Sequence, residues 1–249
     1  MKLALITGGF RRIGATIAAR LAADGWTLAL HGRKDLTPDP TLTAIMGAHE
    51  TRWHGFAADL ADATAVNALM AAVIAEFGRA PDLLVNNASH FVQDDWQSLN
   101  DTGLTERMAT NFAAPVLLSL AMARSLGGAE GAIVNILDQR IKQPNGDQLS
   151  YTLSKQALAG ATETLARVLA PCIRVNAVAP GLTIPTDDYR PAQMVALEDA
   201  MPLKRLPEPD DIADAVLWLA TARATTAQTI FVDGGASMKS FDRDFMFLG

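Results

Sequence analysis

Short apolar runs of strand type alternate along the chain with longer segments of helical periodicity. The runs lie at residues 3–7, 27–31, 53–57, 83–86, 132–136, 173–178 and 229–233, and helical patterns occupy residues 13–24, 64–77, 104–126, 150–169 and 210–221. Strands separated by helices need crossover connections, which produce a parallel sheet covered by helices on both faces. The alternation therefore predicts an α/β, doubly wound Rossmann fold with a seven-stranded parallel sheet.

Two segments interrupt this alternation. Residues 34–50 predict a loop and a weak helix, and residues 182–202, rich in Pro, Thr and Asp, separate the sixth strand from the last helix. The second segment follows the carboxyl end of a strand, where ligands bind in such sheets. It is either a substrate loop or a plain long connection.

The charge and cysteine content exclude several classes of protein. With 21 basic and 27 acidic residues the net charge is −6, and no run of Lys or Arg exceeds two residues, which argues against nucleic acid or an anionic membrane as a partner. The longest internal apolar stretch, residues 113–123, is too short to span a bilayer. The single cysteine, Cys172, and four histidines without metal-ligand spacing predict no disulfide, no metal and a cytoplasmic location.

A glycine-containing turn follows the first strand and opens the first helix. Its sequence, Thr7 to Gly14, reads T-G-x-x-x-R-I-G. Glycines in this context let the backbone approach a pyrophosphate, and the helix N-terminus stabilises the phosphate charge. The turn therefore predicts dinucleotide contacts from the following residues: Gly8, Arg11, Arg12, Ile13 and Gly14.

The end of the second strand carries basic residues where an acidic residue would select NAD. Arg33 and Lys34 stand there, and a guanidinium pairs well with the 2′-phosphate of NADP. The cofactor predicted from these residues is NADPH. The alternative is an exposed basic turn without a ligand.

Tyr151 and Lys155 are four residues apart and therefore share one face of a helix. A nearby ammonium favours the phenolate, so Lys155 and an oxidised nicotinamide are expected to lower the pKa of Tyr151 toward physiological pH. Tyr151 is then the predicted acid and base of a reaction, and Lys155 holds the nicotinamide ribose.

Together these motifs resemble the short-chain dehydrogenase/reductase family over essentially the whole chain. The further matches are Asp59-Leu60, Asn86-Asn87-Ala88, Asn111, Tyr151-x-x-x-Lys155 and Pro180-Gly181. The resemblance implies that Asp59 and Leu60 flank the adenine and that Thr183 bonds the carboxamide group of the nicotinamide. It also implies cofactor contacts from Asn87, Ala88, Ser89, Tyr151, Lys155, Pro180 and Gly181. It also implies that Asn111 bends its helix and holds a water in the proton path.

Four departures from the common family pattern resemble the pteridine reductase branch. Arg12 replaces the middle glycine of the loop, Ser89 follows Asn-Asn-Ala, Phe91 is placed to stack on a pterin, and Asp138 replaces the usual serine. An ionised Asp138 accepts N–H donors and repels a carbonyl oxygen, whereas a protonated one donates to a ring nitrogen. The resemblance makes Arg12, Ser89, Phe91, Asp138 and Tyr151 the predicted substrate contacts, and core packing is the alternative for Phe91.

The predicted protein is one NADP-binding catalytic domain, residues 1–249, that reduces a pterin-type ring. The predicted catalytic residues are Asn111, Asp138, Tyr151 and Lys155. A carbonyl reductase of 3-oxoacyl-thioester type, in which Asp138 has drifted from serine, is the first alternative, and a catalytically silent NADP-sensing module is the second. The resemblance also implies a homo-oligomer, a dimer or a tetramer. The apolar C-terminal residues are expected to pack on this subunit or a neighbour.

Overall fold

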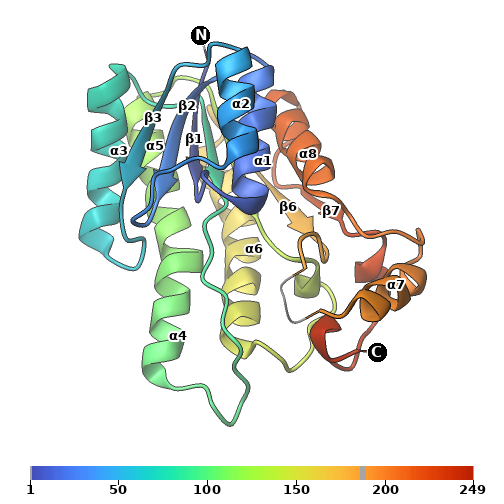
Figure 1. Ribbon diagram of the computed structural model, residues 1–249. Helices are drawn as coiled ribbons and strands as arrows, with labels where there is room; N and C mark the ends of the chain where they lie inside the picture. The colour runs from blue at the N-terminus through green and yellow to red at the C-terminus, as the bar shows by residue number, and fades with distance from the viewer. Residues whose placement is uncertain (1, 186–188, 249) are drawn as a thin grey trace.

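The computed structural model describes residues 2–185 and 189–248, in which seven strands form one parallel sheet (Figure 1). The strand order is β3-β2-β1-β4-β5-β6-β7. The strands are β1 (Leu3–Thr7), β2 (Thr27–Gly32), β3 (Trp53–Ala57), β4 (Leu83–Asn86), β5 (Gly131–Ile136), β6 (Ile173–Pro180) and β7 (Thr229–Val232). The predicted doubly wound α/β fold is therefore confirmed, and the strand order reverses direction between β1 and β4.

Helices cover both faces of the sheet, as the crossover connections require. On one face lie α1 (Arg12–Ala23), α2 (Pro40–Ala48) and α8 (Pro209–Thr221), and on the other lie α3 (Ala63–Phe77), α5 (Ala114–Leu126) and α6 (Leu149–Leu169). The central strands are buried on both sides, which explains their continuous apolar sequences. The weak helix predicted within residues 34–50 corresponds to α2.

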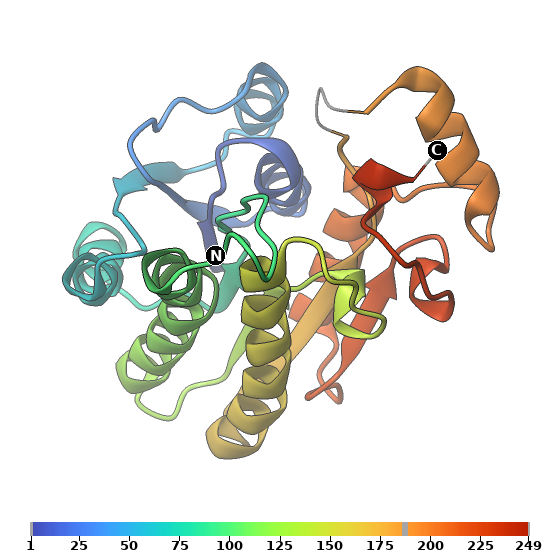
Figure 2. The same cartoon turned by 90° about the horizontal axis from the view of Figure 1, so that it is seen from below.

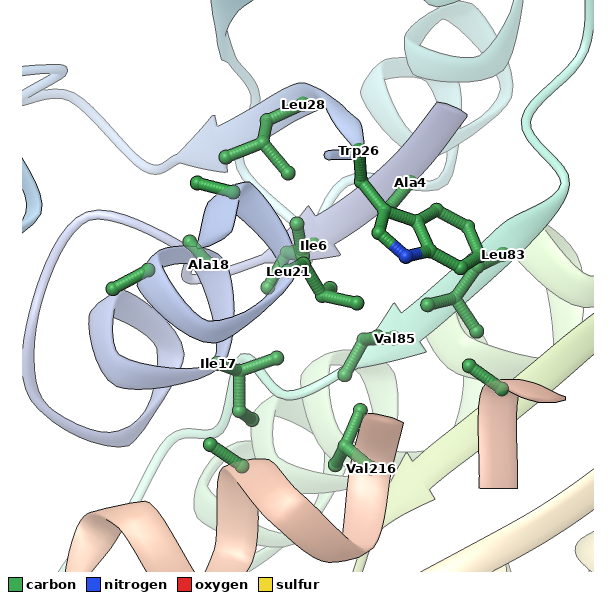
Figure 3. Packing of buried hydrophobic residues seen from close by; sticks show 14 of the residues in the cluster. Ala4, Ile6, Ile17, Ala18, Leu21, Trp26, Leu28, Leu83, Val85 and Val216 are labelled. Carbon is green, nitrogen blue, oxygen red and sulfur yellow. The ribbon is translucent and has the colours of Figure 1, made fainter. Parts of the chain in front are cut away.

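The packing of α1 and α8 against the sheet shows how the first face is held (Figure 3). Ile17 and Leu21 of α1 and Val216 of α8 are at most 1% exposed and contact the apolar side chains of β1 and β4. Complete burial of a residue of this size contributes about 1.5–3 kcal/mol relative to exposure. This layer fixes the start of α1, and hence the turn between β1 and α1.

The long helix expected at residues 104–126 is divided into three parts. Helix α4 (Asp101–Met108) is followed by a π-helical turn, Ala109–Ala113, and then by α5. Asn100 begins α4 by accepting a hydrogen bond from the backbone N–H of Gly103 at 2.8 Å. The π-helical turn contains Asn111, which is 1% exposed.

The segment expected to be an irregular loop, residues 182–202, contains helix α7 (Pro191–Ala200), so the expectation of a long connection without secondary structure is wrong. Residues 186–188 of that segment lie outside the described residues. Pro191 stands in the first turn of α7, where a missing N–H costs no hydrogen bond. Leu197 is buried by contact with residues 241–248, called the C-terminal segment below, which are distant in sequence. This tertiary contact stabilises a helix that the local sequence did not indicate.

The C-terminal segment packs on its own subunit, beside α7 (Figures 1 and 2). Phe245 is 6% exposed and packs with Leu197 and Met201. The side-chain amide of Gln193 donates to the backbone oxygens of Phe245, Met246 and Leu248 at 3.0, 3.0 and 2.7 Å.

No helix in the described part of the chain has the length and apolarity needed to cross a membrane.

Candidate active site

A cleft of about 450 Å³ opens at the carboxyl ends of the central strands. Its lining comes from the turns after β1, β4, β5 and β6, from α6 and from the C-terminal segment. The predicted site residues that it brings together are Gly8, Arg11, Arg12, Ile13, Gly14, Asn87, Ala88, Ser89, Phe91, Asp138, Tyr151, Lys155, Pro180, Gly181 and Thr183. The cleft lies where the strand order reverses, which is where ligands bind in open α/β sheets.

The turn between β1 and α1 depends on close backbone approach. A Cβ atom at Gly14 would collide with the carbonyl oxygen of Gly8, and Gly8 itself has φ +64°. Arg12 has φ +52°, a left-handed conformation that costs a residue with a Cβ about 1–2 kcal/mol. Its guanidinium donates to the backbone oxygen of Ile184 at 3.2 Å, across the cleft.

Asn87 joins this turn to the end of β4. Its side-chain amide donates to the backbone oxygens of Thr7 and Gly8 at 2.9 and 3.2 Å. The hydroxyl of Thr7 accepts from the backbone N–H groups of Asn87 and Ala88 at 2.9 and 3.0 Å. The two strands at the reversal are therefore held in a fixed relation below the cleft.

The basic turn after β2 lies beside the cleft rather than in its lining. Arg33 forms an ion pair with Asp59 at 2.9 Å, while Arg11 pairs with Asp35. Hydrogen bonding to the Ala61 backbone, together with Arg33, holds the pKa of Asp59 below its ordinary value. The predicted adenine contacts differ in exposure: the Asp59 side chain is accessible, whereas Leu60 is buried in the core. Lys34 is exposed.

His31 is a residue of this region whose part the sequence did not indicate. It is 3% exposed, and its Nδ1 accepts from the backbone N–H of Gly8 at 3.3 Å while its Nε2 lies 3.0 Å from the backbone oxygen of Ala58. Burial lowers the pKa of His31, so the neutral ring is favoured. A neutral ring with Nε2–H bonded to Ala58 leaves Nδ1 free to support the phosphate loop.

Tyr151 and Lys155 project from one face of α6 into the cleft. The Tyr151 hydroxyl donates to Asp138 Oδ2 at 3.1 Å, and Lys155 Nζ donates to the backbone oxygen of Ile136 at 2.7 Å. Tyr151 is 8% exposed and Lys155 is 2% exposed. The three predicted catalytic residues Asp138, Tyr151 and Lys155 are therefore brought together.

The pKa of Tyr151 is shifted in the direction opposite to the expected one. Burial and the negative charge of Asp138 raise it well above its ordinary value, and the charge of Arg140 only partly opposes them. Burial also lowers the pKa of Lys155 to about 8. At neutral pH Tyr151 is thus a phenol that carries a proton to donate, which suits a reduction better than an oxidation.

Asn111 makes three side-chain hydrogen bonds, all of them to protein groups. Its amide donates to the backbone oxygen of His90 and to the hydroxyl of Ser154, both at 3.0 Å, and its oxygen accepts from the N–H of His90 at 2.7 Å. Asn111 therefore fixes the segment that carries Ser89 and Phe91. The water predicted at Asn111 stays a prediction.

Phe91 lies at the cleft and not in the core. Its side chain is 44% exposed, and its ring centroid is 5.0 Å from that of Tyr151 with an interplanar angle of 75°. A partly exposed aromatic ring beside Tyr151 can take a flat ligand by stacking, which is worth about 0.5–1.5 kcal/mol beyond area burial. The core-packing alternative for Phe91 is therefore wrong.

Arg140 and Asp244 are cleft residues that the sequence motifs did not reveal. Arg140 Nε donates to Asp138 Oδ1 at 3.2 Å, and Arg140 Nη2 donates to Asp244 Oδ2 at 2.8 Å. Both residues line the cleft and are at most 7% exposed. The available signal for Arg140 was a basic residue two positions after the unusual Asp138, whereas nothing local indicated Asp244.

Comparison with known proteins gives a consistent family. Residues 9–237 match the family described as enoyl-(acyl carrier protein) reductase. The chain is 31% identical over 280 residues to pteridine reductase 1 of Leishmania tarentolae, covering 95% of this chain and 96% of that protein. It is 34% identical over 254 residues to the 3-oxoacyl-(acyl-carrier-protein) reductase FabG of Staphylococcus epidermidis, covering 95% of this chain and 99% of that protein.

Solved structures give the same result. FolM alternative dihydrofolate reductase 1 from Brucella canis, complexed with NADP, matches with a TM-score of 0.86 and 35% identity, covering 98% of this chain and 96% of that chain. The β1–α1 turn, the Asn87 support and the Tyr151–Lys155 pair stand in one cleft of the expected fold. With these matches, they show that the chain belongs to the short-chain dehydrogenase/reductase family of oxidoreductases.

Proposed function

We propose that the protein is an NADPH-dependent reductase that acts on the pterin-type ring of a dihydropterin, dihydromonapterin or dihydrofolate. The observation that carries this proposal is Asp138, ion-paired with Arg140 and hydrogen-bonded to Tyr151 at the cleft. A carboxylate held by a guanidinium accepts N–H groups, which a pterin ring presents, and repels a carbonyl oxygen. The relatives named pteridine reductase and dihydrofolate reductase support the same substrate class.

The residues of the cleft fit a phosphorylated dinucleotide. Backbone at Gly8 and Gly14 leaves no room for side chains at the start of α1, where phosphate groups bind, and Arg33 and Lys34 offer positive charge at the end of β2. NADPH, when bound, supplies hydride. Lys155 and Thr183, which both line the cleft, would hold the nicotinamide half of the cofactor.

The chain's own residues bind the ring and deliver a proton. Phe91 offers one aromatic face to the ring, and Asp138 accepts its N–H groups and so sets its orientation. Tyr151 carries the proton on its hydroxyl oxygen, because its raised pKa keeps it protonated at neutral pH. Arg12 donates to the backbone oxygen of Ile184, so the turn after β1 is linked to the segment after β6.

A 3-oxoacyl-thioester reductase is the second candidate, because relatives with that name are 34% identical over nearly the whole chain. The experiment follows NADPH oxidation by the purified protein with a dihydropterin, dihydrofolate and a 3-oxoacyl thioester. Turnover of the pterin substrates supports the proposal, and turnover of the thioester alone refutes it. Asp138→Ser should damage a pterin reductase and improve a carbonyl reductase.

A catalytically silent NADP-sensing module is the remaining alternative. The intact set of Asn111, Tyr151 and Lys155 in one site argues against it. A Tyr151→Phe protein that leaves the cellular phenotype unchanged would favour the sensor, whereas loss of the phenotype together with turnover favours the enzyme.

We further propose that residues 1–249 act as one catalytic domain, in the cytoplasm and as a homo-oligomer, a tetramer or a dimer. The cleft combines the first turn of the chain with its last residues, which supports one domain. A single cysteine supports a reducing compartment. Leu153 and Val168 on α6 are 41% and 65% exposed, and β7 is an edge strand, which together support association through these elements.

A further inference from the structure

A buried ionic cluster connects the C-terminal segment to the catalytic tyrosine. We call Asp138, Arg140 and Asp244 the Arg140 cluster; Arg140 lies between the two carboxylates at 3.2 and 2.8 Å. The side chains of Arg140 and Asp244 are 8% and 7% exposed. Separating a buried ion pair leaves an uncompensated charge, so each member strongly favours the position of the others.

The same guanidinium also binds the loop before α6. Arg140 Nη1 donates to Gln148 Oε1 at 2.7 Å, and Gln148 donates in turn to Gln93 Oε1 at 2.6 Å. The centre of the Arg140 guanidinium lies 5.2 Å from the Tyr151 ring centroid. Arg140 therefore ties three walls of the cleft to one another: the turn after β5, the loop before α6 and the C-terminal segment.

The division of hydrogen bonds within the Arg140 cluster leaves one carboxylate oxygen for the tyrosine. Arg140 holds Asp138 Oδ1 with its backbone N–H at 2.9 Å and its Nε at 3.2 Å, while Asp138 Oδ2 accepts from Tyr151. Asp244 occupies Arg140 Nη2. Without Asp244, Arg140 Nη2 would be a buried donor that has lost its partner. It would then compete with the Tyr151 hydroxyl for Asp138 Oδ2.

We propose that Arg140 is a positioning residue that couples docking of the C-terminal segment, through Asp244, to the orientation of Asp138 and Tyr151. When the segment is docked, Asp244 accepts from Nη2 of the guanidinium, while Nε and the backbone N–H of Arg140 hold Asp138 Oδ1 and leave Oδ2 to the tyrosine. The segment is thereby part of the reductase site, and Asp244 acts on the reaction without touching the reacting atoms. The turnover measurements rest on the proposed function.

Several charged groups around Tyr151 determine in which direction its pKa changes when Asp244 is replaced. They are Asp138 at the end of β5, Arg140 in the following turn, Asp244 in the C-terminal segment, Lys155 on α6 and Arg12 across the cleft. The charge of Asp244 contributes to the raised pKa of Tyr151. Asp244→Asn keeps the shape of the side chain and removes this charge, so Tyr151 should ionise at lower pH.

The first experiment measures kcat, KM and their pH profile for Asp244→Asn with NADPH and a dihydropterin. We expect kcat to fall on the order of 10-fold to 100-fold, as for a misplaced catalytic group, and the alkaline limb to move to lower pH. Arg243→Gln is the matched control: it removes an exposed side chain of the same segment, which pairs with Asp147 of the loop before α6, and leaves the three residues of the Arg140 cluster unchanged. Equal effects of the two variants, or an unmoved alkaline limb in Asp244→Asn, would overturn the proposal.

The second experiment needs no substrate. The chain contains two tyrosines, Tyr151 and Tyr189, so Tyr189→Phe leaves Tyr151 as the sole phenol. The ultraviolet absorbance of the phenolate then reports Tyr151, and the Tyr151→Phe/Tyr189→Phe protein gives the baseline. We expect the phenolate at lower pH when Asp244→Asn is added, and an unchanged titration would contradict the coupling. If the wild-type protein reduces no pterin, the proposed function fails while this titration still decides the inference.

A third variant keeps the proposal testable if Asp244→Asn does not fold. Arg140→Lys keeps the positive charge, but one ammonium cannot hold Asp138, Gln148 and Asp244 in the geometry of the planar fork. We expect lower kcat, with faster hydrogen exchange at the backbone amides of Met246 and Phe247, both of which are hydrogen-bonded to Asp244. Wild-type kcat together with wild-type exchange in this variant would refute the positioning role.

Discussion

Arg12 combines an unfavourable backbone conformation with a long charged side chain at the cleft. Its φ of +52° is one that glycine adopts without cost, and its guanidinium bonds Ile184 across the cleft. A residue that keeps such a conformation despite its Cβ is expected where the side chain serves function. The stability and the activity of the protein should therefore respond in opposite directions to loss of this side chain.

Arg12→Gly should raise the free energy of unfolding and weaken cofactor binding. Relief of the left-handed strain, about 1–2 kcal/mol, exceeds the added chain entropy of glycine, about 0.5–1 kcal/mol, so a net gain of roughly 0.5–1 kcal/mol is expected. Urea unfolding measures the gain, and a fluorescence titration measures the loss of NADPH affinity. Arg12→Ala is the control, because it removes the guanidinium and retains the strain. A less stable Arg12→Gly protein would contradict this account.

Lys155 should make NADPH binding depend on pH. Burial lowers its pKa to about 8, so above this pH the free protein loses the ammonium that the cofactor needs. Binding must then restore the proton, and the Kd for NADPH should rise roughly fivefold between pH 8 and pH 9. The phosphate of the cofactor is already fully charged there, since its second pKa is about 6.

The test is an NADPH titration between pH 7 and pH 9.5. Lys155→Arg serves as the control, because a guanidinium stays protonated over this range and its variant should show no such dependence even if its affinity is lower. A wild-type affinity that is constant across pH 8 would show that Lys155 does not require its proton for binding.

Sequence motifs predicted where the candidate catalytic residues lie, but not the charges that surround them or the resulting pKa shifts. Tyr151, Lys155 and Asp138 were predictable, because their motif spacing and strand ends place them at one edge of the sheet. The direction of the Tyr151 pKa shift was not, because it depends on burial and on Asp138, which arrives from another element. Arg140 and Asp244 are 104 positions apart in sequence, and only the folded chain brings them together.

At the scale of elements, the π-helical turn between α4 and α5 shapes one wall of the cleft. It places Asn111 inside the molecule, where its three hydrogen bonds join the segment after β4 to Ser154 on α6. The apolar pattern alone predicts one helix over residues 104–126, because it continues through the turn; the bend at Asn111 was implied only by the family resemblance. A π-helical turn holds about one residue more than an α-helical turn, and such turns occur frequently at functional sites. Nothing in the apolar pattern of the sequence indicates it.

Asn111→Ala should lower both stability and activity. It removes one buried and two partly buried hydrogen bonds and leaves the N–H and oxygen of His90 without these partners, so a loss of about 3 kcal/mol in the free energy of unfolding is expected. Activity should fall because the segment carrying Phe91 loses its support. Asn100→Ala, which removes only the α4 cap, is the control and should cost about 1 kcal/mol with normal kcat. Denaturant unfolding and steady-state rates together separate the two.

The central strands and most helices were predictable because both follow from local apolar periodicity. Helix α7 was not, since its buried residue Leu197 packs on Phe245 and its neighbours, far along the chain. The C-terminal segment itself was recognisable as too apolar to be free, but its place at the chain's own cleft depends on Asp244 and Arg140. Elements that are stabilised by distant partners therefore mark the limit of local sequence reasoning here.

At the scale of the whole molecule, the charge distribution differs from the net charge. The chain carries −6 overall, yet Arg11, Arg12, Arg33 and Lys34 all lie at the turns after β1 and β2, where Asp35 and Asp59 pair with only two of them. A phosphorylated dinucleotide would meet positive charge there despite the acidic surface elsewhere. If this local charge favours NADPH, its binding should raise the melting temperature of the whole protein.

NADPH should stabilise the folded protein far more than NADH at the same concentration. A ligand at 100 times its Kd adds about 2.7 kcal/mol, which corresponds to about 5–10 °C in Tm for a chain of this size. NADH that binds on the order of 100-fold more weakly would add about 0.4 kcal/mol, or roughly 1 °C, under the same conditions.

Arg33→Gln should reduce the difference in Tm between the NADPH and NADH complexes, because Arg33 offers charge to the 2′-phosphate. Arg20→Gln is the matched control, since it breaks an exposed pair with Asp214 between α1 and α8 and should keep the difference. Thermal unfolding with each cofactor measures the effect, and equal shifts for NADPH and NADH in the wild-type protein would reject the preference for NADP.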